Sequence, residues 1–177
     1  MGAPSGHDGE RDPFRKPEFE RVFSEEAAYV GRTLRYLGVH EAHVEDVAQE
    51  VFLVVHRRLS ELTGGSIRAW VRQICVHSAS NYRRSKKRRP EDAAAEPDSA
   101  IPASQHDDAE NAQVRRRLLA ALSALPDDQR DVFVLFEIEG LTMSETAEAT
   151  GCPLQTAYAR LYSARSKLQE ALKGASQ

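Results

Sequence analysis

The sequence predicts an all-α fold of two small helical domains joined by a flexible linker, with a helix-turn-helix in the second domain. Three observations support this prediction. Ala, Leu, Arg, Glu and Gln, which favour helices, are common throughout the chain. Apolar residues recur at helical spacing on both sides of a central segment. That segment, residues 90–111, has three prolines, seven acidic residues and no basic ones, and almost no large apolar side chain to offset the entropy of ordering it.

Charge is distributed unevenly and divides the chain into four parts. Residues 18–89 hold 13 Lys or Arg against nine Asp or Glu, whereas residues 112–177 hold eight of each sign. We therefore expect a polar, disordered leader over 1–17, a first domain over 18–89, the acidic linker over 90–111 and a second domain over 112–177.

Composition excludes several classes of protein. No apolar run approaches the roughly 18 residues of a membrane span, and the leader lacks the apolar core of a signal peptide. Cys75 and Cys152 lie in apolar helical patterns, which indicates buried thiols in a reducing cytoplasm and no disulfide framework.

Helices are predicted in the first domain over about 18–37, 44–59 and 66–89. Gly38 is expected to end the first helix and Ser66 to cap the third, which Pro90 stops. The third helix finishes in six basic residues out of seven, positions 83–89. Trp70 lies on its apolar face, where a core position is favoured over a role in stacking on DNA bases.

The second domain contains the most informative pattern. A helix is expected from 112 to about 125, and another from Pro126 through 140. Thr142 and Glu145 fit a capping box for a short helix, and Gly151 makes a turn before a long final helix. Its inward-facing residues are predicted to be Leu154, Ala157, Leu161, Ala164 and Leu168. Short helix, Gly turn and longer helix form the helix-turn-helix layout, whose second helix enters the major groove of DNA.

Three stretches of the chain together resemble one family, the extracytoplasmic-function (ECF) group of sigma-70-type sigma factors. They are EDVAQEVFLVVHRRL (45–59), SIRAWVRQICVHSASNYRRSKKRR (66–89) and LPDDQRDVFVLFEIEGLTMSETAEATGCPLQTAYARLYSARSKL (125–168). The resemblance covers 18–89 and 112–172 in the family's order. It implies a sigma factor that binds core RNA polymerase and directs promoter recognition and transcription initiation in the bacterial cytoplasm. It implies no enzymatic activity and no cofactor, and a cognate anti-sigma factor as a further partner.

The resemblance also assigns candidate site residues. The polymerase-docking set is Asp46, Gln49, Glu50 and Phe52, where acids and an amide with an apolar anchor suit a protein interface. The set for melting and reading the minus-ten promoter element is His77, Ser80, Asn81, Tyr82, Arg83, Arg84, Lys86 and Lys87. The set for the minus-thirty-five element is Gln155, Thr156, Tyr158, Ala159, Arg160, Tyr162, Ser163 and Arg165. The sequence departs from the family pattern at His77, where Asn is common, and at Tyr158, where Arg or Lys is common.

Each assignment has a simpler alternative on the residues alone. The 45–59 face also fits an ordinary solvated helix surface, the basic cluster fits a solvated helix end, and the helix-turn-helix fits a module that only contacts protein. At the level of function, the alternatives are a stand-alone helix-turn-helix regulator and a nucleic-acid-processing enzyme. An enzyme would need a metal or nucleophile constellation, but the histidines show no zinc-site spacing with the cysteines and no Gly-rich phosphate loop is present.

Overall fold

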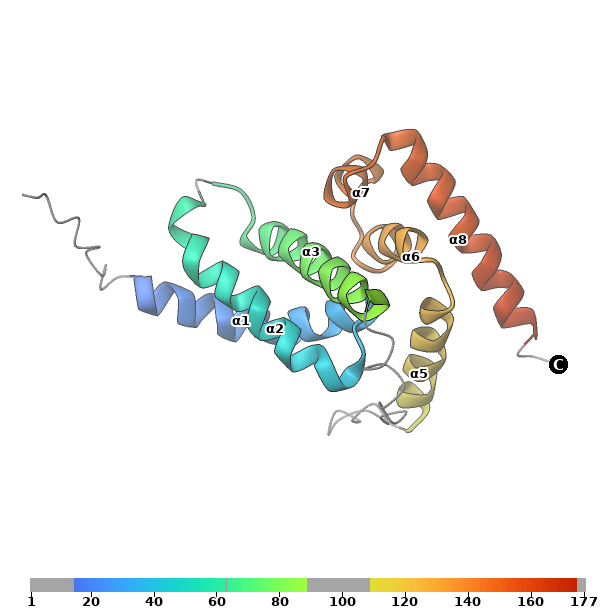
Figure 1. Cartoon of the computed structure of the whole chain (residues 1–177), viewed down its shortest axis with the longest axis horizontal. Coiled ribbons are helices and arrows are strands. Elements are labelled where there is room, and N and C mark those ends of the chain that lie inside the picture. The colour runs from blue at the N-terminus through green and yellow to red at the C-terminus, as the bar shows by residue number, and fades with distance from the viewer. Residues whose placement is uncertain (1–14, 63, 89–108, 175–177) are drawn as a thin grey trace, which may run out of the picture.

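The computed structural model describes residues 15–62, 64–88 and 109–174, and these contain helices and no strands (Figure 1). The elements of the N-terminal half are α1 (Arg15–Tyr36), α2 (Glu41–Arg58), the 3₁₀ turn η1 (Leu59–Glu61) and α3 (Ile67–Arg88). Those of the C-terminal half are α5 (Ala109–Ser123), α6 (Asp127–Phe133), η2 (Val134–Ile138), α7 (Met143–Thr150) and α8 (Leu154–Gly174). The all-α prediction is confirmed. Residues 1–14 of the predicted leader and residues 90–108 of the predicted linker lie outside the described residues, whereas residues 15–17, expected as part of the disordered leader, form the start of α1.

Local signals set the helix ends in the N-terminal half. Gly38 follows α1 with a φ of 85°, a left-handed conformation that glycine adopts without steric cost. The imidazole of His40 accepts a hydrogen bond from the backbone N–H of Ala42 and so caps α2. The Ser66 hydroxyl accepts one from the N–H of Ala69 at 3.4 Å, as its predicted capping role requires.

Helices α1, α2 and α3 pack against one another around an apolar core (Figure 1). Val30, Leu34, Val51, Val55 and Val71 are among its fully buried side chains. Trp70 is partly buried against the same core, as its position on the apolar face predicts. This packing of three amphipathic faces holds the outer faces of α2 and α3 at fixed positions.

The helix-turn-helix of the C-terminal half forms as predicted. Thr142 and Glu145 make a reciprocal capping box at the start of α7, and Gly151 ends that helix with a φ of 64°. Helices α6, α7 and α8 enclose a second core cluster made of Val132, Met143, Ala147, Ala157 and Leu161. Helix α8 therefore presents its opposite face outwards.

Besides the earlier start of α1, the structure differs from the sequence prediction in three places. Leu154 is exposed, because it is the first residue of α8 and lies beyond the packed face that starts at Ala157. The helix expected from Pro126 through 140 is α6 followed by a wider π-helical turn, η2. Helix α5 begins at Ala109 and not at Ala112, within the segment expected as linker.

The two halves also contact each other. Helix α1 packs near α5, helix α3 packs near α7, and one apolar cluster includes Leu34 and Val71 from the first half with Leu122 and Leu135 from the second. In Figure 1 the C-terminal end of α3 lies beside α6, where Arg83 pairs with Asp131. Among the described residues, no helix is long and apolar enough to cross a membrane.

Candidate polymerase and promoter interfaces

The outer face of α2 is acidic and open to solvent. Asp46, Gln49 and Glu50 are all exposed, at the helical spacing that places them together. Phe52, predicted with them as an apolar anchor, is buried at 5% exposure and belongs to the core. The polar members of the docking set therefore share one accessible surface, and Phe52 supports it from beneath.

Two exposed apolar side chains that sequence reasoning missed lie beside this face. Leu53 on α2 is 53% exposed and Phe23 on α1 is 48% exposed. The Phe23 ring packs edge-on against Phe52, with centroids 4.7 Å apart. Large apolar groups beside acidic ones are typical of protein-binding surfaces, because they supply the desolvated anchor that charges alone lack. Leu53 follows Phe52 in the sequence. The predicted apolar anchor, Phe52, is therefore buried, and the adjacent residue, Leu53, is the apolar side chain that is open to solvent.

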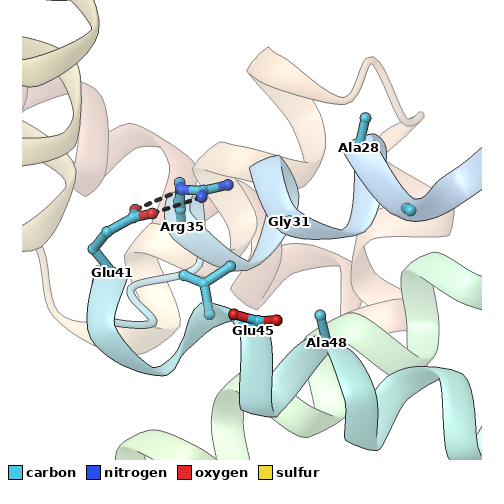
Figure 2. Close-up of a pocket in the computed structure, with 8 residues that line it drawn as sticks. Ala28, Gly31, Arg35, Glu41, Glu45 and Ala48 are labelled. Carbon is cyan, nitrogen blue, oxygen red and sulfur yellow. Dashed lines mark hydrogen bonds and ion pairs between the residues drawn. The ribbon is translucent and has the colours of Figure 1, made fainter. Parts of the chain in front are cut away.

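A shallow groove of about 340 Å³ follows the seam between α1 and α2 (Figure 2). Its walls are mostly small or short side chains, and its lining residues are Ala27, Ala28, Gly31, Arg35, Glu41, Val44, Glu45 and Ala48. At one end Arg35 donates two hydrogen bonds to Glu41, at 2.6 and 2.7 Å, which raises the pKa of Arg35. This pair links the end of α1 to the start of α2, the helix that carries the acidic face.

The C-terminal part of α3 has one exposed polar face. His77, Asn81 and Arg84 are exposed, and Ser80 is half-buried. The Arg84 guanidinium donates to the Ser80 hydroxyl at 3.3 Å and to the Asn81 carbonyl oxygen at 3.2 Å. Tyr82 is half-buried, with its ring 5.6 Å from that of His43. A hollow of about 230 Å³ on this face is lined by Asn81, Arg84, Ser85 and Arg88. This face combines hydrogen-bonding groups with guanidinium planes, the groups that contact unpaired bases and phosphates.

The other face of the same basic end is occupied by the C-terminal half. Arg83 is 7% exposed, and its guanidinium binds Asp131 of α6 at 2.6 Å and the carbonyl oxygen of Leu37. Lys87 donates to Asp127 of α6 at 2.7 Å. Lys86 is half-buried. The structure thus divides the predicted minus-ten set between a face open to solvent and a face held by carboxylates.

The two α6 carboxyl groups that contact α3 have pKa values shifted in opposite directions. Burial raises the pKa of Asp131 to about 6, although Arg83 and Arg130 act in the opposite direction. One oxygen of Asp131 is buried without a hydrogen bond among the described residues, which fits a carboxyl group that is costly to ionise. Burial also acts to raise the pKa of Asp127, but Lys87, Arg83 and Arg130 outweigh it, and the pKa is lowered. The neighbouring cations therefore favour the ionised form of Asp127.

Helix α8 carries the predicted minus-thirty-five set on its outward side. Its exposed members are Gln155, Tyr158, Ala159, Tyr162 and Arg165, and its half-buried members are Thr156, Arg160 and Ser163. Tyr162 is 78% exposed, more open to solvent than tyrosine side chains usually are. The helix that would enter a DNA groove thus presents an amide, two phenols and the Arg165 guanidinium to solvent.

Both arginines of α8 are positioned by acids of α6 and η2. Arg160 pairs with Asp128 at 3.0 Å, and Arg165 donates to Glu137 at 2.7 Å. These partly exposed pairs contribute little stability but restrict two long side chains to the edge of the α8 face. No group of three or more potential metal ligands occurs among the residues that the structure describes.

Comparisons with known proteins identify the family. Residues 23–89 match the family model for sigma-70 region 2, and residues 115–168 match the model for sigma-70 region 4. The RNA polymerase sigma-H factor of Pseudomonas aeruginosa is 31% identical over 147 residues, 76% of this chain and 76% of that protein. The ECF RNA polymerase sigma-E factor of Haemophilus influenzae is 29% identical over 154 residues, 81% of this chain and 80% of that protein. The chain belongs to the sigma-70 family of RNA polymerase sigma factors, within its extracytoplasmic-function group.

Solved structures agree on the fold. The sigma factor RpoE of Bartonella quintana, in complex with the anti-sigma factor NepR, gives a TM-score of 0.70 at 22% identity. That match covers 88% of this chain and 97% of the other. CnrH, in complex with the cytosolic domain of CnrY, gives 0.64 at 22% identity and covers 90% of each chain. Family membership favours a sigma factor over a stand-alone helix-turn-helix regulator.

Proposed function

We propose that this sigma factor uses the acidic face of α2 to dock on core RNA polymerase in the cytoplasm. The observation that supports this most directly is the combination of Asp46, Gln49 and Glu50 with the exposed Leu53 and Phe23. Acids and an amide complement basic partner side chains, while the two apolar groups supply buried area. The partner surface that fits is a basic one with an apolar strip, and the catalysis of RNA synthesis belongs to the polymerase.

In the same proposal the exposed face of α3 binds the minus-ten element. Asn81 and His77 offer hydrogen bonds to exposed base edges, and Arg84 and Arg88 lie where they can neutralise phosphate. Helix α8 enters the major groove at the minus-thirty-five element, where Gln155 reads adenine and Ala159 contacts a thymine methyl group. Docking by one domain makes DNA binding by the other effectively intramolecular, so that neither contact needs high affinity alone.

A cognate anti-sigma factor is the further partner in this proposal. Two similar folds, RpoE and CnrH, were solved with NepR and with the cytosolic domain of CnrY respectively. An inhibitor of this chain would cover the exposed apolar groups Phe23 and Leu53, since the polymerase needs the same surface.

The experiment is the binding of the labelled chain to bacterial core RNA polymerase, measured by fluorescence anisotropy without DNA. Saturable binding is expected for the wild type, and a loss of at least about tenfold in affinity for Asp46→Arg with Gln49→Ala. Glu170→Arg, a reversal of an exposed acid on α8, is the matched control and should bind as the wild type does. If the Asp46→Arg, Gln49→Ala double variant bound core polymerase as tightly as the wild type does, the acidic face of α2 would not be the docking surface.

A further inference from the structure

The outward side of α8 carries an inference about which bases the chain reads. Gln155, Ala159, Tyr162 and Ser166 are exposed and follow one another at intervals of four, three and four residues. The buried side chains of α8 repeat these intervals two positions later, and they are Ala157, Leu161, Ala164 and Leu168. At 3.6 residues per turn, an offset of two positions is about 200°, so the exposed stripe lies opposite the packed one. It is therefore the part of α8 that points most directly into a DNA groove.

Tyr158 completes the set of side chains that a helix in the major groove presents to base edges. Counted from Gln155, the residues Tyr158, Ala159 and Tyr162 occupy positions i+3, i+4 and i+7, which share one face of a helix. The two phenol side chains are 51% and 78% exposed and lie about one turn apart. Their rings are apolar surface that contact with DNA would remove from water.

The cations of α8 lie beside these four reading positions and not among them. Arg160 follows Ala159 and Arg165 precedes Ser166, so the two arginines lie about 100° from the exposed stripe, on opposite sides of it. Lys167 is the remaining cation among the described side chains of α8, and it lies seven positions after Arg160, on the same side. The base-facing stripe is thus uncharged, with positive charge along both of its edges.

Contacts with α6 and η2 keep the two arginines at those edges. Asp128 pairs with Arg160 at 3.0 Å, and Glu137 accepts a hydrogen bond from Arg165 at 2.7 Å. The Arg165 guanidinium also lies 5.9 Å from the centre of the Phe136 ring. Both guanidinium groups are directed sideways, toward the phosphates that border a groove, and not toward the base pairs at its floor.

The chemistry of the four reading positions selects A·T base pairs. Guanine is most often read by an Arg or Lys that donates to its O6 and N7 atoms, and these positions hold no cation. A glutamine pairs with N6 and N7 of adenine, while alanine and aromatic side chains contact the C5 methyl group of thymine. One amide, one methyl group and two rings therefore all favour the same class of base pair.

We propose that α8 reads A·T base pairs in the minus-thirty-five element, with the rings of Tyr158 and Tyr162 packed on thymine methyl groups. The inference rests on the proposed function for the placement of α8 in the major groove, and on the exposed face of α8 for the identity of the bases. Tyr162 is then a specificity-determining residue, whereas Arg160 and Arg165 bind phosphates only.

The first test is a selection from promoter duplexes with randomised upstream positions, bound by the full chain reconstituted with bacterial core RNA polymerase. A·T pairs should be enriched wherever Tyr158→Ala or Tyr162→Ala changes the preference. Tyr162→Phe should keep the wild-type preference, because the ring and not the hydroxyl group makes the contact. Tyr158→Arg should introduce a G·C pair, because it places a cation among the reading positions. G·C pairs selected by the wild type at a tyrosine-dependent position would overturn the inference.

The second test removes single methyl groups from the DNA. Each thymine of the selected element is replaced in turn by deoxyuridine, which pairs as thymine does but lacks the C5 methyl group. At a contacted position the wild type should bind about fourfold more weakly, the equivalent of one buried methylene group. Tyr162→Ala should lose this response at one thymine and Tyr158→Ala at another, whereas a variant that merely folds poorly would weaken binding to all duplexes alike.

Gln169→Ala is the matched control, because Gln169 is exposed on α8 but lies beyond the four reading positions. It should keep the wild-type response to deoxyuridine at every thymine, and Tyr162→Phe should keep it as well. Deoxyuridine without effect at all positions in the wild type would overturn the contact between the tyrosine rings and the methyl groups.

The inference and the proposed function fail separately. An upstream preference that depends on α8, but selects G·C pairs at the tyrosine positions or ignores the thymine methyl groups, overturns only the A·T reading. The absence of any upstream preference that depends on α8 overturns its assignment to the minus-thirty-five element, and the A·T reading with it. If the chain did not bind core polymerase, the docking function would fail, and the same selection with the full chain alone would still test the reading by α8.

Discussion

Arg83 and Asp131 are 48 positions apart in sequence, and their side chains meet at 2.6 Å where the two domains touch. Both side chains are almost fully buried. The pair joins the end of α3, which carries the basic cluster, to the middle of α6, which supports the helix-turn-helix. Separation of the two domains would break the pair and expose the Asp131 carboxyl to water, so the titration of Asp131 is expected to depend on domain contact.

Asp131 is expected to titrate near pH 6 in the folded chain. Burial raises its pKa to about 6 from an ordinary value of 3.8, and the groups that face it are Arg83, Arg130 and Asp127. Between about pH 4 and pH 6 the folded chain holds a proton that the unfolded chain has released. The free energy of unfolding therefore falls as pH rises through this window. Carboxyl-detected NMR gives the midpoint, and thermal melts give the slope.

The control for this titration is Asp131→Asn, which should flatten the slope between pH 4 and pH 6. Asp127 does not interfere, because its pKa is lowered and it titrates below its usual range. An Asp131 midpoint near 4 would contradict the assignment. It would mean that the carboxyl is hydrated in solution and that the domains are apart.

Gly38→Ala is expected to destabilise the chain more than Gly65→Ala. Both glycines have a left-handed backbone, with φ of 85° and 87°, so an added Cβ costs about 1 kcal/mol of strain at either position. A Cβ at Gly65 would meet nothing within 4 Å, whereas one at Gly38 would meet the Arg130 guanidinium. Denaturant unfolding of both variants measures the difference, which isolates the contact of Arg130 with the turn. Equal losses would show that Arg130 does not occupy this turn in solution.

Thr142→Ala is expected to cost about 1 kcal/mol of stability, a typical loss for a removed N-cap. The Thr142 hydroxyl accepts from the N–H of Glu145 at 3.3 Å and donates to its carboxylate at 2.7 Å. Urea unfolding should show a lower midpoint with an unchanged slope. Ser144→Ala, an exposed position in the same turn, should change stability by much less. Similar losses of stability in Thr142→Ala and Ser144→Ala would mean that the capping box of Thr142 and Glu145 contributes nothing specific.

Features set by neighbouring residues were predictable from the sequence. The capping box at Thr142, the turn at Gly151 and the cap at Ser66 each depend on residues within a few positions, and all three form. The helical periodicity of α1 to α3 likewise determines which residues make the core. Family resemblance added which faces were expected to bind DNA and polymerase, and that assignment stays a prediction residue by residue.

Features set by tertiary packing were not predictable in the same way. Phe52 is buried and Leu53 exposed because the angle between α1 and α2 decides which side of the helix is covered. Leu154 fits the apolar period of α8 but lies beyond the end of its packed face. The partners of Arg83 and Lys87 come from the other domain, and a run of basic residues does not indicate which of its members meets an acid.

The recognition helix offers the sharpest test of the DNA-binding assignment. Arg165→Ala should weaken DNA binding by a similar factor for every sequence and reduce the slope of log affinity against log salt by about 1, as expected for a lost phosphate contact. Arg160→Ala should act in the same direction. Tyr158→Ala should instead change which upstream bases are preferred, because its side chain points outward from the middle of the exposed face.

Promoter-library selection with the reconstituted polymerase would measure these preferences, with Lys167→Ala as the control for loss of an exposed positive charge on α8. The control should leave the base preference unchanged. If Tyr158→Ala also left the preference at every upstream position unchanged, the tyrosine face would not read bases. The surface that reads bases would then have to lie elsewhere on α8. Gln155 and Thr156 would be the next residues to replace, because they lie at the N-terminal end of α8 and the start of a recognition helix is the part that reaches the base edges.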